Sequence, residues 1–104
     1  MFTINGETWL IKFTQPYDEI LLMNSGKYSL GVCDDTLKTI FISNELKDKK
    51  LKLVLCHEIV HAAMFSYNVI LSYEQEELIA NIIATYGKEI IQITEDMFKR
   101  LSIK

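Results

Sequence analysis

The chain has 104 residues, of which 49% are hydrophobic and 24% are charged, and its formal net charge is −3. A chain of this length has room for one hydrophobic core, so residues 1–104 are expected to form a single domain. The hydrophobic content excludes a disordered chain, and the acidic balance argues against nucleic acid as the main partner.

No segment approaches the roughly 18 uninterrupted apolar residues of a membrane-spanning helix. Residues 1–6 lack the basic start and the long apolar core of a secretory signal. We therefore expect a cytoplasmic protein with no membrane partner. In that compartment Cys33 and Cys56, which do not form a C-x-x-C pair, are expected as free thiols.

A β-hairpin is predicted at the start of the chain. Residues 1–4 and 7–13 are rich in β-branched and aromatic side chains, and they flank Asn5-Gly6. This dipeptide favours a type I′ turn, because both central residues of that turn need positive φ. Alternation along the second strand places three apolar side chains on one face, namely Trp9, Ile11 and Phe13.

A second pair of strands follows. Residues 17–23 fit a short helix or turn, and residues 28–33 and 38–43 form the strands. Asp34 and Asp35 lie between these strands. Carboxylates of this kind can bind metals, but such a pair more often serves the turn itself, and that is the expected role.

A central buried helix is predicted over residues 50–67, because its residues are apolar nearly all round. Ser43 or Asn44 is the expected N-terminal cap, since both residue types accept hydrogen bonds from the free amides of the first turn. Asn68 is expected to end the helix.

Two further helices are predicted. Ser72 and Gln75 form a capping box ahead of a helix over residues 73–91, and Thr94 is the expected cap of a final amphipathic helix over residues 95–101. Together the elements predict an α+β fold in which a small, mainly antiparallel sheet from the N-terminal half packs on two successive helices.

The central helix carries the pattern H-E-x-x-H, as His57, Glu58 and His61. Histidines four residues apart share one helix face, so both imidazoles can reach one Zn²⁺ ion, with the glutamate placed as a general base. Two imidazoles buried beside a carboxylate are costly without a partner. We therefore predict that the histidines bind zinc and that Glu58 is catalytic, in preference to a satisfied polar cluster in the core.

A catalytic zinc usually has three protein ligands, and the chain contains no third histidine. Glu77 in the next helix is the expected third ligand. Asn81 follows it at i+4 on the same face, where its amide oxygen can accept a hydrogen bond from a ligand histidine and orient the ring. Glu76 is the alternative ligand, since a rotation of about 100° exchanges the two. Glutamates at a helix N-terminus are also favoured by the helix dipole without any metal.

H-E-x-x-H followed by Glu77-x-x-Ala-Asn81 resembles the gluzincin metallopeptidases. The layout from Trp9 to Ile91 looks like their small phage- and mobile-element-encoded members, akin to the ImmA/IrrE group and the minimal gluzincins. This resemblance implies a zincin-like fold, in which a β-sheet precedes the active-site helix and a glutamate helix follows it. It also implies a tyrosine or histidine that stabilises the oxyanion. The candidates by residue type alone are Tyr67, Tyr73 and Tyr86.

We expect a zinc metallopeptidase that hydrolyses peptide bonds of an intracellular protein. A protein or peptide substrate would align on an exposed edge strand, residues 28–33. The alternative is a catalytically inactive, zinc-stabilised regulatory or interaction module. Glu58 favours the enzyme, because a purely structural metal site needs no base.

Overall fold

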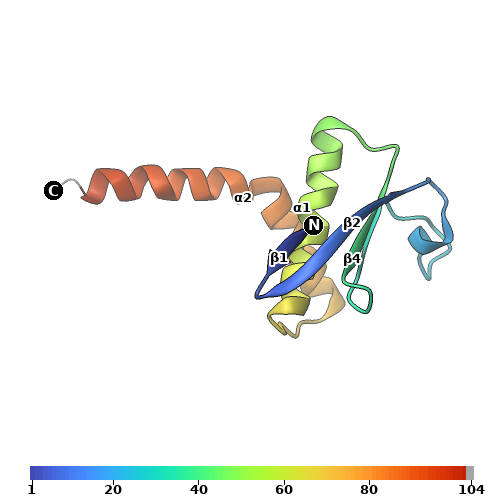
Figure 1. Cartoon of the computed structure of the whole chain (residues 1–104). Helices are drawn as coiled ribbons and strands as arrows, with labels where there is room; N and C mark the ends of the chain where they lie inside the picture. Colours follow the sequence, from blue (N-terminus) through green and yellow to red (C-terminus); the bar gives the residue numbers. More distant parts are fainter. Residues whose placement is uncertain (103–104) are drawn as a thin grey trace.

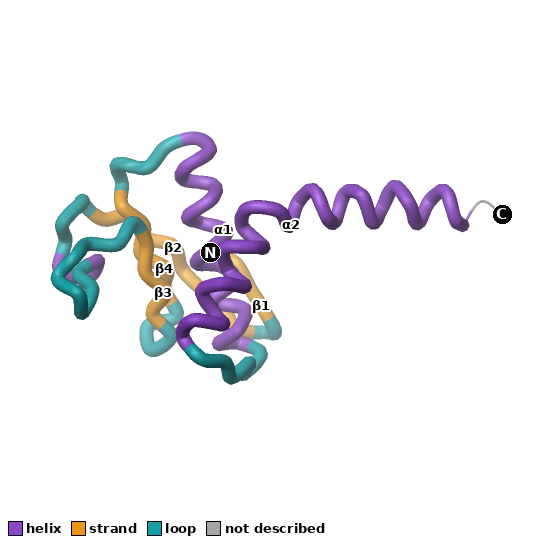
Figure 2. The backbone as a smooth tube through the Cα atoms, turned by 180° about the vertical axis from the view of Figure 1, so that it is seen from behind, coloured by secondary structure: helices purple, strands orange, loops and turns teal. Residues whose placement is uncertain are grey.

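The computed structural model describes residues 1–102 and has an α+β fold, with a four-stranded mixed sheet and two helices (Figure 1). In Figures 1 and 2, α1 lies between the sheet and the first half of α2, while the second half of α2 leaves the body of the molecule. The elements in chain order are β1 (Phe2–Ile4), β2 (Glu7–Thr14), the 3-10 turn η1 (Glu19–Leu21), β3 (Gly31–Asp34), β4 (Thr39–Ser43), α1 (Asp48–Ser66) and α2 (Tyr73–Ser102).

The predicted hairpin at Asn5-Gly6 is confirmed. Both residues have positive φ, 49° and 77°, and β1 pairs antiparallel with β2 so that Phe2 lies opposite Trp9. These are the dihedral signs that a type I′ turn requires. The hairpin therefore places the only tryptophan of the chain on the face of the sheet that packs into the core.

The sheet order is β1-β2-β4-β3, which the sequence did not indicate. β1–β2 and β3–β4 are antiparallel, but β2 and β4 run parallel, with Leu10 opposite Thr39 and Thr14 opposite Ser43. The sheet is therefore mixed, where a mainly antiparallel one was expected. Parallel neighbours need a crossover of a dozen or more residues, and the segment from Gln15 to Lys38 supplies it.

β3 lies at the edge of the sheet, as expected, but it is shorter than predicted. It begins at Gly31, whereas the sequence indicated a strand from Tyr28. Tyr28 instead forms an isolated bridge with Leu22 at the end of η1, so the chain reaches the sheet edge only three residues later.

The predicted cap of α1 is wrong. Ser43 is the last residue of β4 and is buried, and the backbone N–H of Asn44 donates to the carbonyl of Thr14 at 2.8 Å. α1 therefore begins only at Asp48, after Lys47, which makes no side-chain capping bond. Its C-terminal end agrees with the prediction, since Asn68 adopts φ of 55° directly after the helix.

The capping box of α2 is confirmed. The N–H of Gln75 donates to the Ser72 hydroxyl at 3.2 Å, and the Ser72 N–H donates to the Gln75 side chain at 3.1 Å. A separate helix starting after Thr94 is wrong, because α2 continues through this position and the Thr94 hydroxyl donates to the Ile90 carbonyl one turn back. Within residues 1–102, neither helix has an apolar stretch long enough to cross a bilayer.

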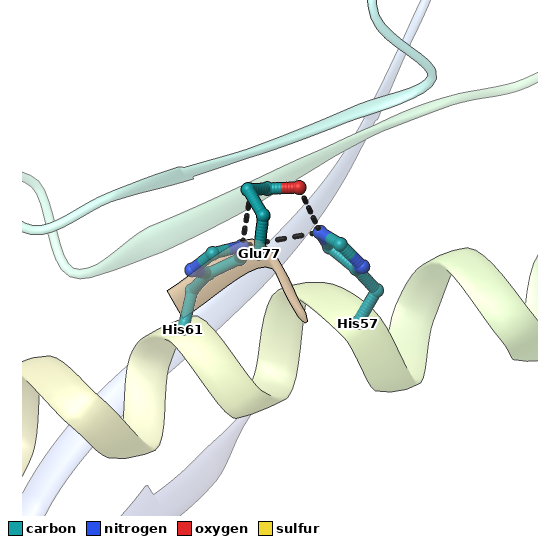
Figure 3. A group of neighbouring side chains, drawn as sticks. All are labelled: His57, His61 and Glu77. Atoms are coloured by element: carbon teal, nitrogen blue, oxygen red, sulfur yellow. Dashed lines mark hydrogen bonds and ion pairs between the residues drawn. The ribbon is translucent and has the colours of Figure 1, made fainter. Parts of the chain in front are cut away.

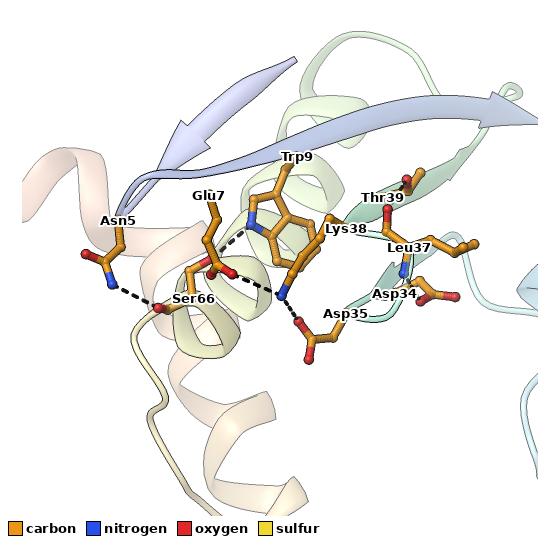
Figure 4. Close-up of polar contacts among 9 residues, drawn as sticks. All are labelled: Asn5, Glu7, Trp9, Asp34, Asp35, Leu37, Lys38, Thr39 and Ser66. Atoms are coloured by element: carbon orange, nitrogen blue, oxygen red, sulfur yellow. Dashed lines mark hydrogen bonds and ion pairs between the residues drawn. The ribbon is translucent and has the colours of Figure 1, made fainter.

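The C-terminal end of α1 is fixed to the hairpin by Ser66 (Figure 4). The Trp9 indole N–H donates to the Ser66 hydroxyl at 2.9 Å, and the Asn5 amide donates to the Ser66 carbonyl at 3.0 Å. The indole is fully buried and the Lys38 ammonium lies 5.2 Å from its ring centre. Trp9 belongs to the hydrophobic core, whose other buried members are Ile40, Ile42, Leu46 and Ala62.

Replacing Ser66 by alanine should lower the free energy of unfolding by about 1–3 kcal/mol, because it leaves the buried Trp9 N–H without an acceptor. Urea unfolding followed by tryptophan fluorescence measures the change. Ser25→Ala, at an exposed loop position, is the control and should change stability by less than about 0.5 kcal/mol. Equal stabilities of the two variants would show that the indole hydrogen bond contributes nothing.

Candidate metal centre

Three ligand atoms converge between the two helices. His57 and His61 project from one side of α1, and Glu77 projects from the first turns of α2 toward them (Figure 3). His57 Nε2 lies 3.2 Å from Glu77 Oε2, His61 Nε2 lies 2.9 Å from Glu77 Oε1, and the two Nε2 atoms are 3.1 Å apart. The sequence-predicted residues His57, His61 and Glu77 therefore form one group that could hold a metal ion.

Helical periodicity and a short loop explain this convergence. Histidines four apart lie one above the other on the same face of a helix. The segment from Tyr67 to Ser72 turns the chain back, so that the N-terminal part of α2 packs on α1 beside the rings. Ala80, which is fully buried on α2, has a side chain small enough to let the two helices approach closely.

Glu76 orients one of the histidines. Its Oε1 lies 2.6 Å from His61 Nδ1, on the side of the ring that faces away from Glu77. A carboxylate at Nδ1 favours the tautomer that carries the proton there and leaves the Nε2 lone pair free. Glu76, which the sequence left open as an alternative ligand, thus contacts the ligand histidine instead.

The orienting role predicted for Asn81 is not found. Asn81 is exposed and, within residues 1–102, its side chain makes no hydrogen bond to either histidine, although it lines the same cavity. It lies one turn farther along α2 than Glu77. α2 crosses α1 close to the first turn of α2. Glu76 and Glu77 therefore reach the His61 ring, whereas Asn81, one turn farther along, does not.

The donor set fits a cation. The proton of His61 is held at Nδ1, which leaves a lone pair on its Nε2. This lone pair points into the same small space as His57 Nε2 and the Glu77 carboxylate. Such groups repel one another unless a proton or a metal ion lies between them. Two imidazoles and one carboxylate are ordinary ligands of transition-metal ions, and a cavity beside them leaves a further position open.

Glu58 is buried against the sheet, with 7% of its surface exposed, and it lines the same cavity as the histidines. Burial raises the pKa of its carboxyl above the usual value, while the neighbouring His61 and His57 lower this pKa and Glu77 raises it. The proposed general base therefore lies in a partly desolvated position within the electrostatic reach of all three ligand residues.

Gly31 makes room for Glu58, and the sequence analysis did not identify it. A Cβ atom at this position would lie 3.1 Å from Glu58 Cγ and 3.0 Å from Val54 Cγ1, which is tighter than ordinary packing. The absence of a side chain at residue 31 thus lets β3 lie this close to α1 without displacing Val54 or Glu58. The available signal was a glycine inside a strand, which often marks a close backbone approach.

The cavity has a volume of about 780 Å³ and is open to solvent. β3, α1 and α2 form its walls, so the edge strand, Glu58 and the three ligand residues face one space. Tyr73 lines it, whereas Tyr67 and Tyr86 are not among its lining residues. The apolar side chains around it include Met23, Leu30, Val32, Phe65 and Leu71.

Other possible ligands have different roles. Burial and the nearby Glu58 carboxylate raise the pKa of the Cys33 thiol to about 12, and Cys33 does not belong to the group of residues that could hold a metal ion. Asp34 accepts the Leu37 N–H at 2.9 Å and Asp35 pairs with Lys38 (Figure 4), so both aspartates serve the turn, as expected. Both cysteines are free.

No protein-family model, curated protein or solved structure matches the chain.

Three alanine variants at the start of α2 should separate the roles of its glutamates. Glu77→Ala removes a ligand and should lower metal affinity by at least about 100-fold, and Glu76→Ala removes the partner of His61 Nδ1 and should lower it about 10–100-fold. Competition with a chromogenic chelator measures both affinities.

Glu74→Ala is the matched control, because Glu74 lies in the same turn and is exposed. It should bind metal as tightly as the unchanged chain. Equal affinities for all three variants would place the third ligand elsewhere.

Proposed function

We propose that the chain is a zinc-dependent metallopeptidase with a zincin-like arrangement of the gluzincin type. The observation that carries the proposal is the convergence of His57, His61 and Glu77 beside the buried Glu58, in a cavity that an edge strand borders. A H-E-x-x-H helix with a glutamate from the next helix is the ligand set of this class of enzyme.

Zinc is the proposed metal because the ligand types and spacing suit it. Bonds of 2.0–2.1 Å in tetrahedral geometry separate the ligand atoms of a zinc ion by roughly 3.3 Å. The two Nε2 atoms here are 3.1 Å apart, and each lies 2.9 or 3.2 Å from a carboxylate oxygen of Glu77, a different oxygen for each histidine. A small adjustment of the side chains is therefore enough to admit the ion. Imidazole and carboxylate ligands around one open position are typical of catalytic zinc.

In the proposed reaction, zinc supplies a Lewis acid that lowers the pKa of a water molecule towards about 7 and polarises the carbonyl of the scissile bond. His57, His61 and Glu77 hold the ion, and Glu76 holds the His61 ring in orientation through Nδ1. Glu58 accepts the proton of the attacking water and delivers it to the leaving amine. Its buried carboxyl, with a raised pKa, binds this proton more readily than a solvated glutamate does.

The proposed substrate is a protein or peptide in extended conformation. β3 pairs with β4 on one side only, so its other side is free to pair with a substrate strand. The same strand contributes Gly31, Val32 and Cys33 to the wall of the cavity. A bound strand would therefore run past Glu58 and the metal ligands.

A metal kept only for stability is the competing function. Such a site is normally closed by four protein ligands and has no use for a base. The open cavity and the buried Glu58 beside the ligands favour catalysis over this alternative.

Glu58→Gln should keep the fold and bind one zinc ion per chain but lose peptidase activity by about 100-fold or more, because the amide has the same shape and cannot accept the proton. Metal content and cleavage of a peptide library are measured on the same sample. The chelator-treated chain is the inactive control. Activity of the Gln variant at the level of the unchanged chain would exclude Glu58 as the base.

Tyr73→Phe should lower kcat by about 10–100-fold and leave zinc affinity unchanged, because Tyr73 is the one of the three candidate tyrosines that lines the cavity, and we propose its hydroxyl as the donor to the oxyanion. Tyr86→Phe is the matched control on the same helix and should retain full activity. If both variants retain full activity, the oxyanion is stabilised by another group.

A further inference from the structure

The second half of α2 forms an arm that projects away from the rest of the molecule (Figures 1 and 2). α2 bends near its middle (Figure 2). Its one glycine, Gly87, stands near the midpoint of the range Tyr73–Ser102 and lowers the local preference for helix. Beyond the bend every residue from 88 to 102 is exposed. The arm accounts for much of the longest dimension of the protein, 56 Å compared with 29 and 27 Å for the other two.

One side of this arm is apolar. Its large hydrophobic side chains recur at helical spacing and are between 43% and 69% exposed. The opposite side is polar, and Gln92 hydrogen-bonds to Asp96 there at 3.1 Å. The apolar side, called the arm face below, is formed by Ile90, Ile91, Ile93, Met97, Phe98 and Leu101.

The arm has little to stabilise it in water beyond its own helical hydrogen bonds, because its apolar side chains are exposed. An isolated helix shorter than about 12–15 residues is marginal, and helices in proteins are stabilised chiefly by burying an apolar face. An exposed apolar surface of this size normally marks an interaction site. A partner that covers the arm face would supply the missing stabilisation.

We propose that the partner is a second copy of this chain, with the two arms packed antiparallel about a two-fold axis. An axis between Ile93 and Thr94 places Ile90 of each copy opposite Met97 of the other. It also brings Glu89 of each copy to within about two residues' rise, roughly 3 Å along the axis, of Arg100 of the other. Glu89 and Arg100 lie on the same edge of the arm face. Antiparallel pairing about a two-fold axis brings this edge of one copy beside the same edge of the other. Glu89 of each copy then pairs with Arg100 of the other, which gives two ion pairs.

The amount of buried surface is sufficient. Six side chains that are about half exposed offer roughly 600 Å² per chain, so pairing buries about 1,200 Å² in total, which lies at the lower end of the range for specific interfaces. A parallel pair would bring the two globular bodies to the same end of the helices, whereas an antiparallel pair separates them.

A groove at the base of the arm lies where the tip of the second arm would end. This groove, of about 540 Å³, lies between α1 and α2 and is lined mainly by apolar side chains, including Cys56, Ile83 and Ile91. In the proposed register, Arg100 of the second copy lies opposite Gly87, which lines the groove. The tip of each arm is thereby buried against the body of the other copy.

Sedimentation equilibrium of the unchanged chain should give a dimer at about 50 µM. Ile90→Lys places a charge on the arm face, opposite Met97 of the other copy, and should weaken the dimer at least 100-fold. Glu95→Lys places the same side chain on the polar side, outside the groove, and should leave the dimer intact. A monomeric chain at 100 µM, or a dimer unaffected by Ile90→Lys, overturns the proposal.

A charge-reversal experiment tests the direction of the helices without relying on a core substitution. Glu89→Arg and Arg100→Glu should each weaken the homodimer about tenfold, because each places like charges opposite one another twice. A mixture of the two variants should form mainly heterodimers, in which both pairs regain opposite charges. Native mass spectrometry distinguishes the species, and a statistical mixture of dimers overturns the antiparallel register.

Discussion

Two imidazoles and two carboxylates are enclosed between α1 and α2, where unpaired charge is costly. Glu77 reaches both histidines and Glu76 reaches His61, and a proton or a metal ion between these groups turns their close approach into attraction. The crossing of α2 over α1 is therefore set by polar contacts at its first turn as well as by packing at Ala80. A displacement of α2 would separate the ligand atoms and leave buried groups unpaired.

The sheet makes a separate contribution, which is to shape the surroundings of the carboxylate on α1. The absence of a side chain at Gly31 lets β3 come close enough to cover Glu58, and the Trp9–Ser66 hydrogen bond holds the end of α1 against the hairpin. One face of α1 is thus desolvated by strands while the other meets α2. Glu58 and the two histidines belong to one helix, but the groups that surround them come from opposite sides of it.

The sequence was informative wherever a pattern is local. The spacing of His57 and His61 fixes their common face, and the structure brings Glu77 to them. The role of Glu76 could not be predicted. Which nitrogen of His61 each of the two adjacent glutamates contacts depends on how the two helices cross. The parallel pairing of β2 with β4 likewise joins segments that share no local signal. Thr94 can cap a helix or bond back within one, and local sequence does not decide between these states.

The site and the sheet differ in how far along the chain their contacts reach. His57 and Glu77 are 20 positions apart, whereas the Trp9–Ser66 bond spans 57. Closing a short loop costs less conformational entropy than closing a long one, so the helical hairpin can form before the strands dock on it. A metal ion would then bind the partly folded hairpin as well as the native protein. A ligand stabilises the native state only relative to states that bind the ligand less tightly. The ion would therefore stabilise the packing of α1 on α2 more than the packing of the sheet on α1.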